Sequence, residues 1–114
     1  MKDARTKSKN ELLPGTLEML ILKTLSTQSM HGYGIAQHIQ MLSADVLTIE
    51  EGSLYPALQR MLVKKWVLAE WKISANNRRA RFYKLTTAGK RQLGVEESRF
   101  SEMFGAIRRV MKAT

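Results

Sequence analysis

The spacing of the apolar residues changes twice along this chain, and this pattern constrains the fold more than any other feature. Up to about Lys65 the apolar residues recur at intervals of three and four, as in amphipathic helices. From Val67 to Thr86 they recur at intervals of two, as in strands, and after Thr87 the helical spacing returns. The chain is therefore predicted to be mainly α-helical, with one small β-hairpin before a long C-terminal helix.

The segment before the hairpin is predicted to contain three helices and one short strand. The first helix covers roughly residues 16–26, with Thr16 as its N-cap. The second opens at the segment His31–Gly34 and ends near residues 43–45. Residues 46–49 are apolar and partly β-branched, which predicts a small strand between the second helix and the third.

The third helix is expected to start at Glu51–Ser53. Ser53 can cap it, and Pro56 is then expected in the first turn, where proline removes no helical hydrogen bond. Its predicted buried face consists of Leu54, Leu58, Met61 and Leu62. The order of three helices followed by a two-stranded hairpin is typical of a winged helix-turn-helix domain.

The predicted hairpin combines apolar contacts with a strong positive charge. Its strands cover residues 67–74 and 81–86, joined by the Asn-rich segment 75–79. The apolar contacts are expected from Trp71, Ile73, Phe82 and Leu85. Between positions 72 and 84 there is no acidic residue, but there are five basic ones: Lys72, Arg78, Arg79, Arg81 and Lys84.

The last helix, expected to be capped by Thr87 and to end near Lys112, carries an apolar stripe at heptad-like spacing. The stripe consists of Leu93, Phe100, Met103, Phe104, Ile107, Val110 and Met111. Such a seam packs against another helix, either of its own domain or of a second copy. Because the first three helices already have apolar faces that match one another, we favour a dimer interface.

The net charge indicates a polyanionic partner. The chain has 19 Lys and Arg against 10 Asp and Glu, a formal charge of +9, which favours nucleic acid or an anionic membrane surface. Cysteine is absent, which excludes disulfides and thiolate metal sites and is typical of a reducing compartment. No segment is apolar over the ~20 residues that a membrane span needs, and the N-terminus does not have the pattern of a secretory signal, so we expect a cytoplasmic protein without membrane contact.

Catalytic and metal-binding patterns are weak in this sequence. His31 and His38 are seven residues apart and have no third ligand at a suitable spacing. The pair Glu50–Glu51 has no partner base, and Gly32 and Gly34 do not follow a strand as a phosphate-binding loop does. We therefore expect no enzyme, no cofactor and no metal.

Nucleic-acid contact is predicted for the third helix and the hairpin, because a major groove admits one helix while basic side chains beside it contact phosphates or a narrow minor groove. The alternative is a solvated basic loop next to a helix that only packs. Tyr33 and His31, near the start of the second helix, could reach the DNA backbone or could equally serve local packing. The predicted DNA-binding residues are Ser53, Tyr55, Pro56, Gln59, Arg60, Lys64, Asn77, Arg78, Arg79, Arg81, Tyr33 and His31.

These elements suggest three parts. Residues 1–11 carry basic residues and no apolar period, which predicts a flexible basic arm that either crosses a DNA backbone or is merely solvated. Residues 12–86 form the winged helix domain, and residues 87–114 form the dimerisation helix.

Four segments resemble the PadR family of transcriptional regulators. They are Leu13–Leu17, His31–Ile35, Glu51–Leu58 and Asn76–Thr86, which together span most of residues 12–90. The resemblance implies a dimeric winged helix protein, usually a repressor, that binds palindromic operators. It also implies that the segment from Ser53 supplies the recognition helix and that Arg78 and Arg79 lie in the wing.

The single C-terminal helix resembles the compact branch of that family, in which some members bind flat aromatic drugs through a tryptophan on the last helix. This chain departs from that pattern, since Trp66 and Trp71 both precede the hairpin tip. Phe100 and Phe104 could line a smaller pocket but are equally expected as seam residues, which leaves a small-molecule effector possible but unsupported.

Taken together, the sequence predicts a cytoplasmic homodimer that binds double-stranded DNA at an inverted-repeat operator and represses transcription. Two alternatives stay open at this point. One is a winged helix module that binds a partner protein. The other is a ligand-responsive, multidrug-type regulator with a pocket at its dimer interface.

Overall fold

The computed structural model describes residue 12 and residues 15–113, and these residues form four helices and three strands. The predicted arm at residues 1–11 lies outside the described residues. In chain order the elements are α2 (Thr16–Leu25), β1 (Met30–His31), α3 (Gly32–Leu42), α4 (Glu51–Val63), β2 (Val67–Ile73), β3 (Arg79–Leu85) and α5 (Thr87–Lys112).

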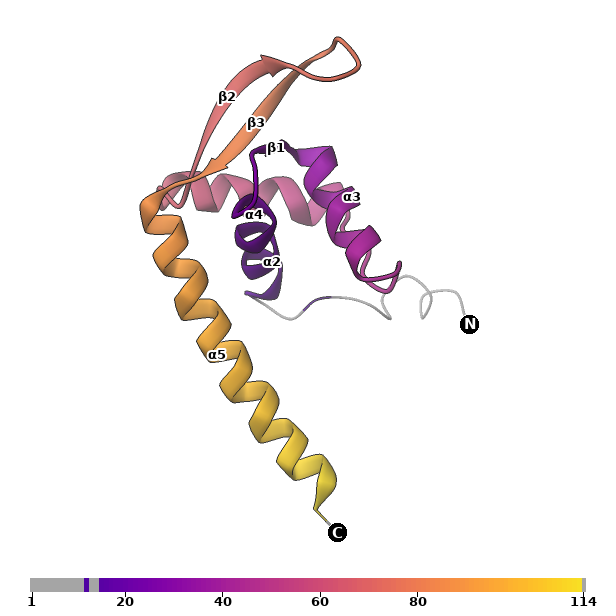
Figure 1. Ribbon diagram of the computed structural model, residues 1–114, viewed down its shortest axis with the longest axis vertical. Helices are drawn as coiled ribbons and strands as arrows, with labels where there is room; N and C mark the ends of the chain where they lie inside the picture. The colour runs from indigo at the N-terminus through magenta and orange to yellow at the C-terminus, as the bar shows by residue number, and fades with distance from the viewer. Residues whose placement is uncertain (1–11, 13–14, 114) are drawn as a thin grey trace.

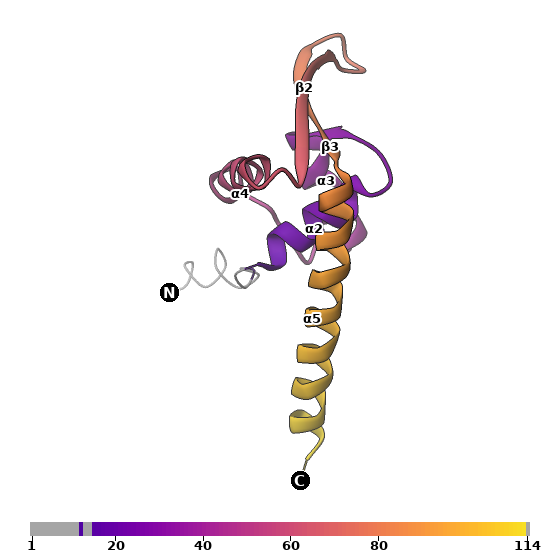
Figure 2. The ribbon, with the colours of Figure 1, turned by 90° about the vertical axis from the view of Figure 1, so that its left-hand side faces the viewer.

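The molecule has a small helical body with one projection at each end (Figure 1). Helices α2, α3 and α4 cluster together, the β2–β3 hairpin extends from one side of the cluster, and α5 extends from the other (Figure 2). The described chain measures 56 × 39 × 23 Å along its principal axes. The predicted fold class, a mainly α-helical winged helix domain followed by a C-terminal helix, is confirmed.

The core joins the three helices of the body to the base of the hairpin. Burial of each large core side chain contributes roughly 1.5–3 kcal/mol relative to leaving it exposed. The largest fully buried side chains are Ile21, Leu22, Ile35, Leu54, Leu58, Met61 and Val67, which come from α2, α3, α4 and β2. On α4 the predicted Leu62 is only partly buried, and Ala57 completes the buried face in its place.

A third strand that the sequence pattern did not predict completes the sheet. The strand order is β1-β3-β2, all antiparallel, and β1 pairs Met30 with Tyr83 and His31 with Phe82. Two residues are too few to show an alternating pattern, which is why β1 escaped prediction. This short pairing ties the connection between α2 and α3 to the hairpin.

The prediction that Ser53 caps the third helix is wrong. Helix α4 begins at Glu51 with Glu50 as its N-cap, whose carbonyl accepts the Leu54 N–H at 2.9 Å. Pro56 therefore lies in the second turn, inside the helix, where the hydrogen bond to the Gly52 carbonyl is missing. Gly52 is exposed, so water can satisfy that carbonyl.

Three other local predictions are corrected by the structure. Residues 46–49 form no strand; they follow two residues with positive φ, Ala44 and Asp45, and no neighbouring strand pairs with them. The N-cap of α2 is Gly15, with φ of 87°, and Thr16 is the first helical residue. The N-cap of α5 is Thr86, not Thr87, because the Thr86 hydroxyl accepts the Gly89 N–H at 2.9 Å.

The hairpin reaches beyond the helical body, and this overturns part of its predicted packing. Leu85 is buried in the core, whereas Phe82 lies on the other face of the sheet, half-buried and in edge-on contact with His31. Trp71 and Ile73 are instead 58% and 64% exposed, because they lie on the outer part of β2, where no helix of the described chain covers them. Their apolar contacts with the core are therefore absent.

The start of α5 packs closely against the base of β2, and Gly89 makes this possible. A Cβ at position 89 would lie 2.2 Å from the Trp66 carbonyl oxygen and 2.6 Å from the Leu85 side chain, whereas a Cβ at Gly94 would meet nothing within 4 Å. We expect Gly89→Ala to destabilise the fold by about 2 kcal/mol or more through overpacking against backbone. Gly94→Ala, in the same helix, should stabilise it by up to about 1 kcal/mol through helix propensity.

Chemical denaturation of the two variants and the wild type measures both effects. Equal midpoints for Gly89→Ala and Gly94→Ala would contradict the close packing of α5 on Trp66.

Candidate nucleic-acid interface

Helix α4 presents a continuous exposed face opposite its core residues. At 100° per residue, Pro56, Gln59 and Val63 point directly away from the buried side, and all three are exposed. Tyr55 lies on one flank of this face, and Arg60 lies on the other. The remaining predicted helix residues, Ser53 and Lys64, are also exposed and lie on the Arg60 flank.

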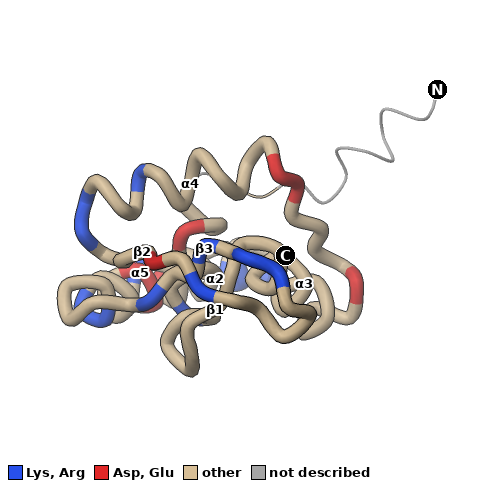
Figure 3. Tube along the Cα trace, turned by 90° about the horizontal axis from the view of Figure 1, so that it is seen from above, with Lys and Arg blue, Asp and Glu red and all other residues tan. Residues whose placement is uncertain are grey.

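The charges along α4 are separated by sign. Glu50 and Glu51 lie at its N-terminal end, whereas Arg60, Lys64 and Lys65 lie at or just beyond its C-terminal end. Figure 3 shows this separation, with acidic segments at one end of α4 and basic segments at the other end and along the hairpin. This arrangement complements the helix dipole, and along α4 it places the attraction for a polyanion at the C-terminal half, the end that leads into the hairpin.

Tyr55 is fixed by the start of α3. A Cβ at Gly32 would lie 2.6–2.8 Å from the Tyr55 ring and hydroxyl, so only glycine leaves room for the ring at this contact. Although Tyr55 is 43% exposed, burial of its hydroxyl raises its pKa above the ordinary value, and the charges of Glu51 and Tyr83 add to the shift. Tyr55 therefore packs at one edge and offers the other edge to solvent.

Arg60 is held by an ion pair that sequence analysis did not predict. Its Nε and Nη2 donate to the same carboxylate oxygen of Glu18, at 3.1 and 2.7 Å. Glu18 lies on α2, and its side chain is only 17% exposed. The pair fastens α4 to α2 and positions the guanidinium beside the outward face of α4.

The tip of the hairpin is a tight turn organised by Ser74. The Ser74 N–H donates to the Arg78 carbonyl at 2.7 Å, and its carbonyl accepts the Asn77 N–H at 2.9 Å. Asn77 adopts a left-handed conformation with φ of 62°, which asparagine tolerates better than most residues. Asn77 and Arg78, both predicted DNA-binding residues, are exposed at this tip.

The strand register decides which hairpin side chains share a face with the helices. Paired residues lie on the same face of an antiparallel sheet. Val67 pairs with Leu85, and these two belong to the core, so their face is the helix side. The same face continues outward through the pairs Trp71–Arg81 and Ile73–Arg79, whereas Lys72 and Lys84 lie on the opposite face.

Arg79 and Arg81 therefore lie on the helix side of the hairpin, on its outer part, and Figure 2 shows α4 beside the base of β2. The wing is cationic on both faces. Of the predicted hairpin residues, Arg79 and Arg81 share the helix side, while Asn77 and Arg78 lie at the turn.

Tyr33 and His31 have different surroundings. Tyr33 is exposed on α3, and its hydroxyl accepts a hydrogen bond from Gln37 at 3.1 Å. The His31 Nδ1 accepts the Gly34 N–H at 3.0 Å, which caps α3, and the ring contacts Phe82 edge-on. For His31 the structure shows local packing, the alternative considered from the sequence; its contact with DNA stays a prediction, as does that of Tyr33.

The apolar stripe of α5 is exposed in the described chain, with one exception. Leu93 is buried in the chain's own core, because the first turns of α5 pack on α2 and the base of the hairpin, so its assignment to the dimer interface is corrected. Phe100 and Phe104 stack in parallel with ring centroids 5.8 Å apart. The exposed members of the stripe are Phe100, Met103, Phe104, Ile107, Val110 and Met111.

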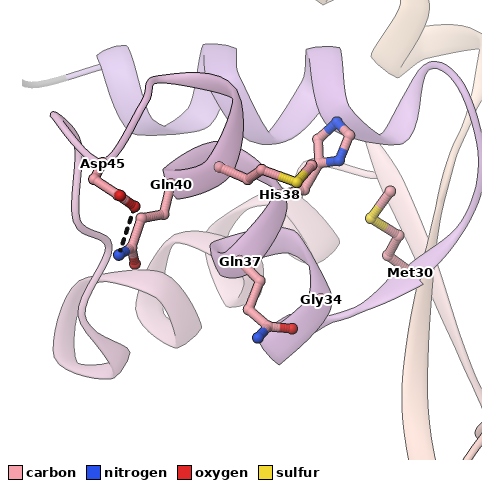
Figure 4. A pocket seen from close by; sticks show the side chains of 7 residues that line it. Met30, Gly34, Gln37, His38, Gln40 and Asp45 are labelled. Carbon is pink, nitrogen blue, oxygen red and sulfur yellow. Dashed lines mark hydrogen bonds between the residues drawn. The ribbon is translucent and has the colours of Figure 1, made fainter.

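Two open pockets lie outside the α4–hairpin surface. The first, about 570 Å³, lies on α3 and includes His38 and Gln40, whose amide donates to Asp45 at 3.2 Å (Figure 4). The second, about 690 Å³, lies between α2 and α5 and includes Leu20 and Phe100. Among the described residues no three metal-ligating side chains come together, and none of the described helices has the length and hydropathy of a membrane span.

Sequence reasoning missed two features of this surface. Glu18 belongs to the first helix, whose apolar spacing contains no information about a partner 42 positions away. The sequence therefore did not predict that its carboxylate would bind Arg60. Trp71 was expected to supply apolar contacts, yet it is 58% exposed and lies across from Arg81. The two-residue spacing correctly placed Trp71 and Ile73 on the same face of the sheet as the core residues. Spacing alone does not show that the helical body ends before these two positions.

Known proteins are similar to this chain in sequence and in structure. The model of the "Transcriptional regulator PadR-like family" matches residues 21–95. A PadR family transcription regulator from Clostridium difficile is 25% identical, with a TM-score of 0.73 over 85% of this chain and 99% of that one.

Two further solved structures share the fold. A PadR-like transcriptional regulator from Bacillus cereus is 22% identical, with a TM-score of 0.75 over 98% of this chain and 100% of that one. A transcriptional regulator from Clostridium thermocellum is 18% identical, with a TM-score of 0.77 over 94% and 99%. Because both alignments cover nearly all of each chain, the shared fold includes the long C-terminal helix.

The contact between Gly32 and Tyr55 predicts a change in titration. Gly32→Ala should displace the Tyr55 ring toward solvent at a stability cost of about 1 kcal/mol. Because burial is the main cause of the shift, the pKa of Tyr55 should fall back toward its ordinary value of 10.0. In the wild type the neutral hydroxyl contributes stability that is complete below about pH 10 and is lost as the pH rises through the raised pKa.

Ultraviolet difference titration measures this pKa, and Tyr55→Phe identifies its signal. Gly52→Ala, where a Cβ meets nothing within 4 Å, is the matched control and should leave the titration unchanged. An unchanged Tyr55 titration in Gly32→Ala would rule out the contact.

Proposed function

This chain belongs to the PadR-like family of transcriptional regulators, and we propose that it binds double-stranded DNA as a homodimer through α4 and the β2–β3 wing. The observation that carries the proposal is the hairpin register. Arg79 and Arg81 lie on the helix side of the sheet, the side packed against the helical body that presents the outward face of α4. One duplex could then contact both elements.

In the proposed complex, α4 enters the major groove and the wing follows the backbone into the neighbouring minor groove. Gln59 lies at the centre of the outward face of α4, and its amide has the donor and acceptor that pair with an adenine edge. Tyr55 and Arg60 flank it and would contact backbone or bases. Arg78, at the tip of the wing, would bind phosphates, which supply affinity without sequence preference.

The dimer is proposed to form through α5. Its exposed stripe has a large apolar side chain on each turn from Phe100 to Met111, and a lone helix rarely leaves such a stripe in water. The pocket between α2 and α5, lined in part by Met19, Leu20 and Phe100, would receive side chains of the second copy. In this division residues 12–86 bind DNA and residues 87–114 dimerise.

A symmetric dimer presents two copies of α4, which would fit an inverted-repeat operator with half-sites about 34 Å apart, one turn of duplex. Occupation of such a site near a promoter would repress transcription in the cytoplasm. The regulator would thus act by excluding other proteins from its operator, without chemistry of its own.

DNA binding should depend steeply on salt. If about six phosphates are neutralised per dimer, log K should fall against log salt with a slope of roughly −5. Replacing Arg78 by Ala should weaken binding to all sequences alike and make the slope shallower by about 1 for each phosphate that is no longer neutralised. Fluorescence anisotropy with genomic fragments measures both, and salt-independent binding by the wild type would contradict the proposal.

Gln59→Ala tests sequence preference, whereas the arginine variant tests general affinity. It should cost about 1–3 kcal/mol at the preferred site and change the preference among fragments, with the salt slope unaltered. Selection of bound fragments from the source genome supplies the preferred site. Identical selections by Gln59→Ala and the wild type would contradict base contact by this residue.

The oligomeric state should depend on the stripe of α5. Ile107→Glu places a charge at its centre, and because burying an unpaired charge is unfavourable, the dimer should dissociate at micromolar concentration. Arg109→Glu introduces the same side chain on the opposite side of the helix and is the matched control. Light scattering gives the mass of each, and the proposed interface is wrong if Ile107→Glu retains the wild-type mass.

A further inference from the structure

The outer part of the wing exposes two large apolar side chains that phosphate contact does not require. Trp71 and Ile73 are 58% and 64% exposed, and both lie on the helix side of the sheet, across from Arg81 and Arg79. A hairpin tip that was merely solvated would favour polar residues at such positions. The indole of Trp71 in particular presents a broad flat surface beside the arginines.

The guanidinium of Arg79 stacks on the indole of Trp71. The Cζ of Arg79 lies 4.9 Å from the centroid of the Trp71 ring, within the range of a cation–π contact. In the part of the chain that the structure describes, Arg79 has no acidic side chain within ion-pair distance. The sequence has no acid between Glu70 and Glu96, so the indole, and not a carboxylate, holds this guanidinium.

The support beneath Arg79 is rigid on both sides. Trp71 and Ile73 belong to a continuous antiparallel ladder with Arg81 and Arg79, and the turn beyond them is fixed by the Ser74 hydrogen bonds. An arginine stacked on such a base has fewer conformations to lose when it enters a groove, and arginine side-chain entropy is large. Stacking leaves the guanidinium edge and its donors free for a ligand.

We propose that Trp71 positions Arg79 for insertion into a narrow minor groove, which gives the wing a preference for A·T-rich duplex DNA. The inference rests on the proposed DNA-binding function. Narrow A·T-rich grooves have an enhanced negative potential that attracts arginine, whereas a phosphate contact alone would not distinguish base composition. Trp71 is thus a positioning residue that adds selectivity through its neighbour.

The test compares Trp71→Leu with Trp71→Phe in the full chain. Leucine keeps apolar bulk without a π face, whereas phenylalanine keeps the face. We expect Trp71→Leu to lose about two- to fivefold in affinity for an A·T-rich duplex and to keep its affinity for a G·C-rich one. Trp71→Phe should retain most of the preference. Duplexes of about 30 base pairs hold two half-sites one turn apart.

A double-mutant cycle separates positioning from a general structural role. In an Arg79→Ala background, Trp71→Leu should have no further effect on the A·T preference. Arg79→Ala should make the salt slope shallower by about 2, because it removes one cation from each wing of the dimer, whereas Trp71→Leu should leave the slope unchanged because it removes no charge. Leu68→Ala, an equally exposed apolar residue on the opposite face of β2, is the control and should bind like the wild type.

The outcomes distinguish this inference from the proposed function. If the wild type shows no salt-sensitive duplex binding, the proposed function fails. If the wild type binds duplex but Trp71→Leu keeps the A·T preference, or Trp71→Phe loses as much as Trp71→Leu, the positioning role is overturned. Tighter binding of single-stranded DNA than of duplex would also overturn it, since the indole would then stack on bases in place of Arg79.

Discussion

The wing and the C-terminal helix are anchored at one joint, and the rest of the structure depends on it. At the base of β2 the Trp66 carbonyl accepts the Thr86 N–H at 3.0 Å, and the Thr86 hydroxyl donates to the Lys65 carbonyl at 2.7 Å. The first turn of α5 lies directly against this backbone at Gly89. Because one compact contact fixes both the hairpin and α5, the distance between the proposed DNA contacts and the proposed dimer seam is set by rigid elements.

The sequence predicts the class and order of the elements well, because both follow from hydrophobic periods sustained over many residues. Its failures have local or long-range causes. The N-cap of α4 is Glu50 and not the predicted Ser53, because several residues in that segment can begin a helix and the sequence pattern does not choose among them. The two-residue strand β1 has no period to detect, and the pairing of Arg60 with Glu18 depends on how two helices cross.

The candidate surface was predictable in part for the same reason. Period-two spacing places Arg79 and Arg81 on one face, and the absence of acids nearby leaves their charge uncompensated. Spacing does not reveal how far the helical body extends under the hairpin, so Trp71 was expected to supply apolar contacts, although it is exposed. An apolar residue just beyond the edge of a core follows the same pattern as one inside it.

We expect different partners for the two exposed apolar regions of this molecule, because their electrostatic surroundings differ. On α5 the apolar side chains form a stripe along successive turns, with Arg108 stacked over Phe104 at its edge, which suits burial against another helix. On the wing, Trp71 and Ile73 lie across from Arg81 and Arg79 on the neighbouring strand. Burial against an apolar partner would therefore bury two guanidinium groups without a counter-charge. A groove with anionic walls is the surface that satisfies both kinds of side chain, and this argues for DNA at the wing and protein at α5.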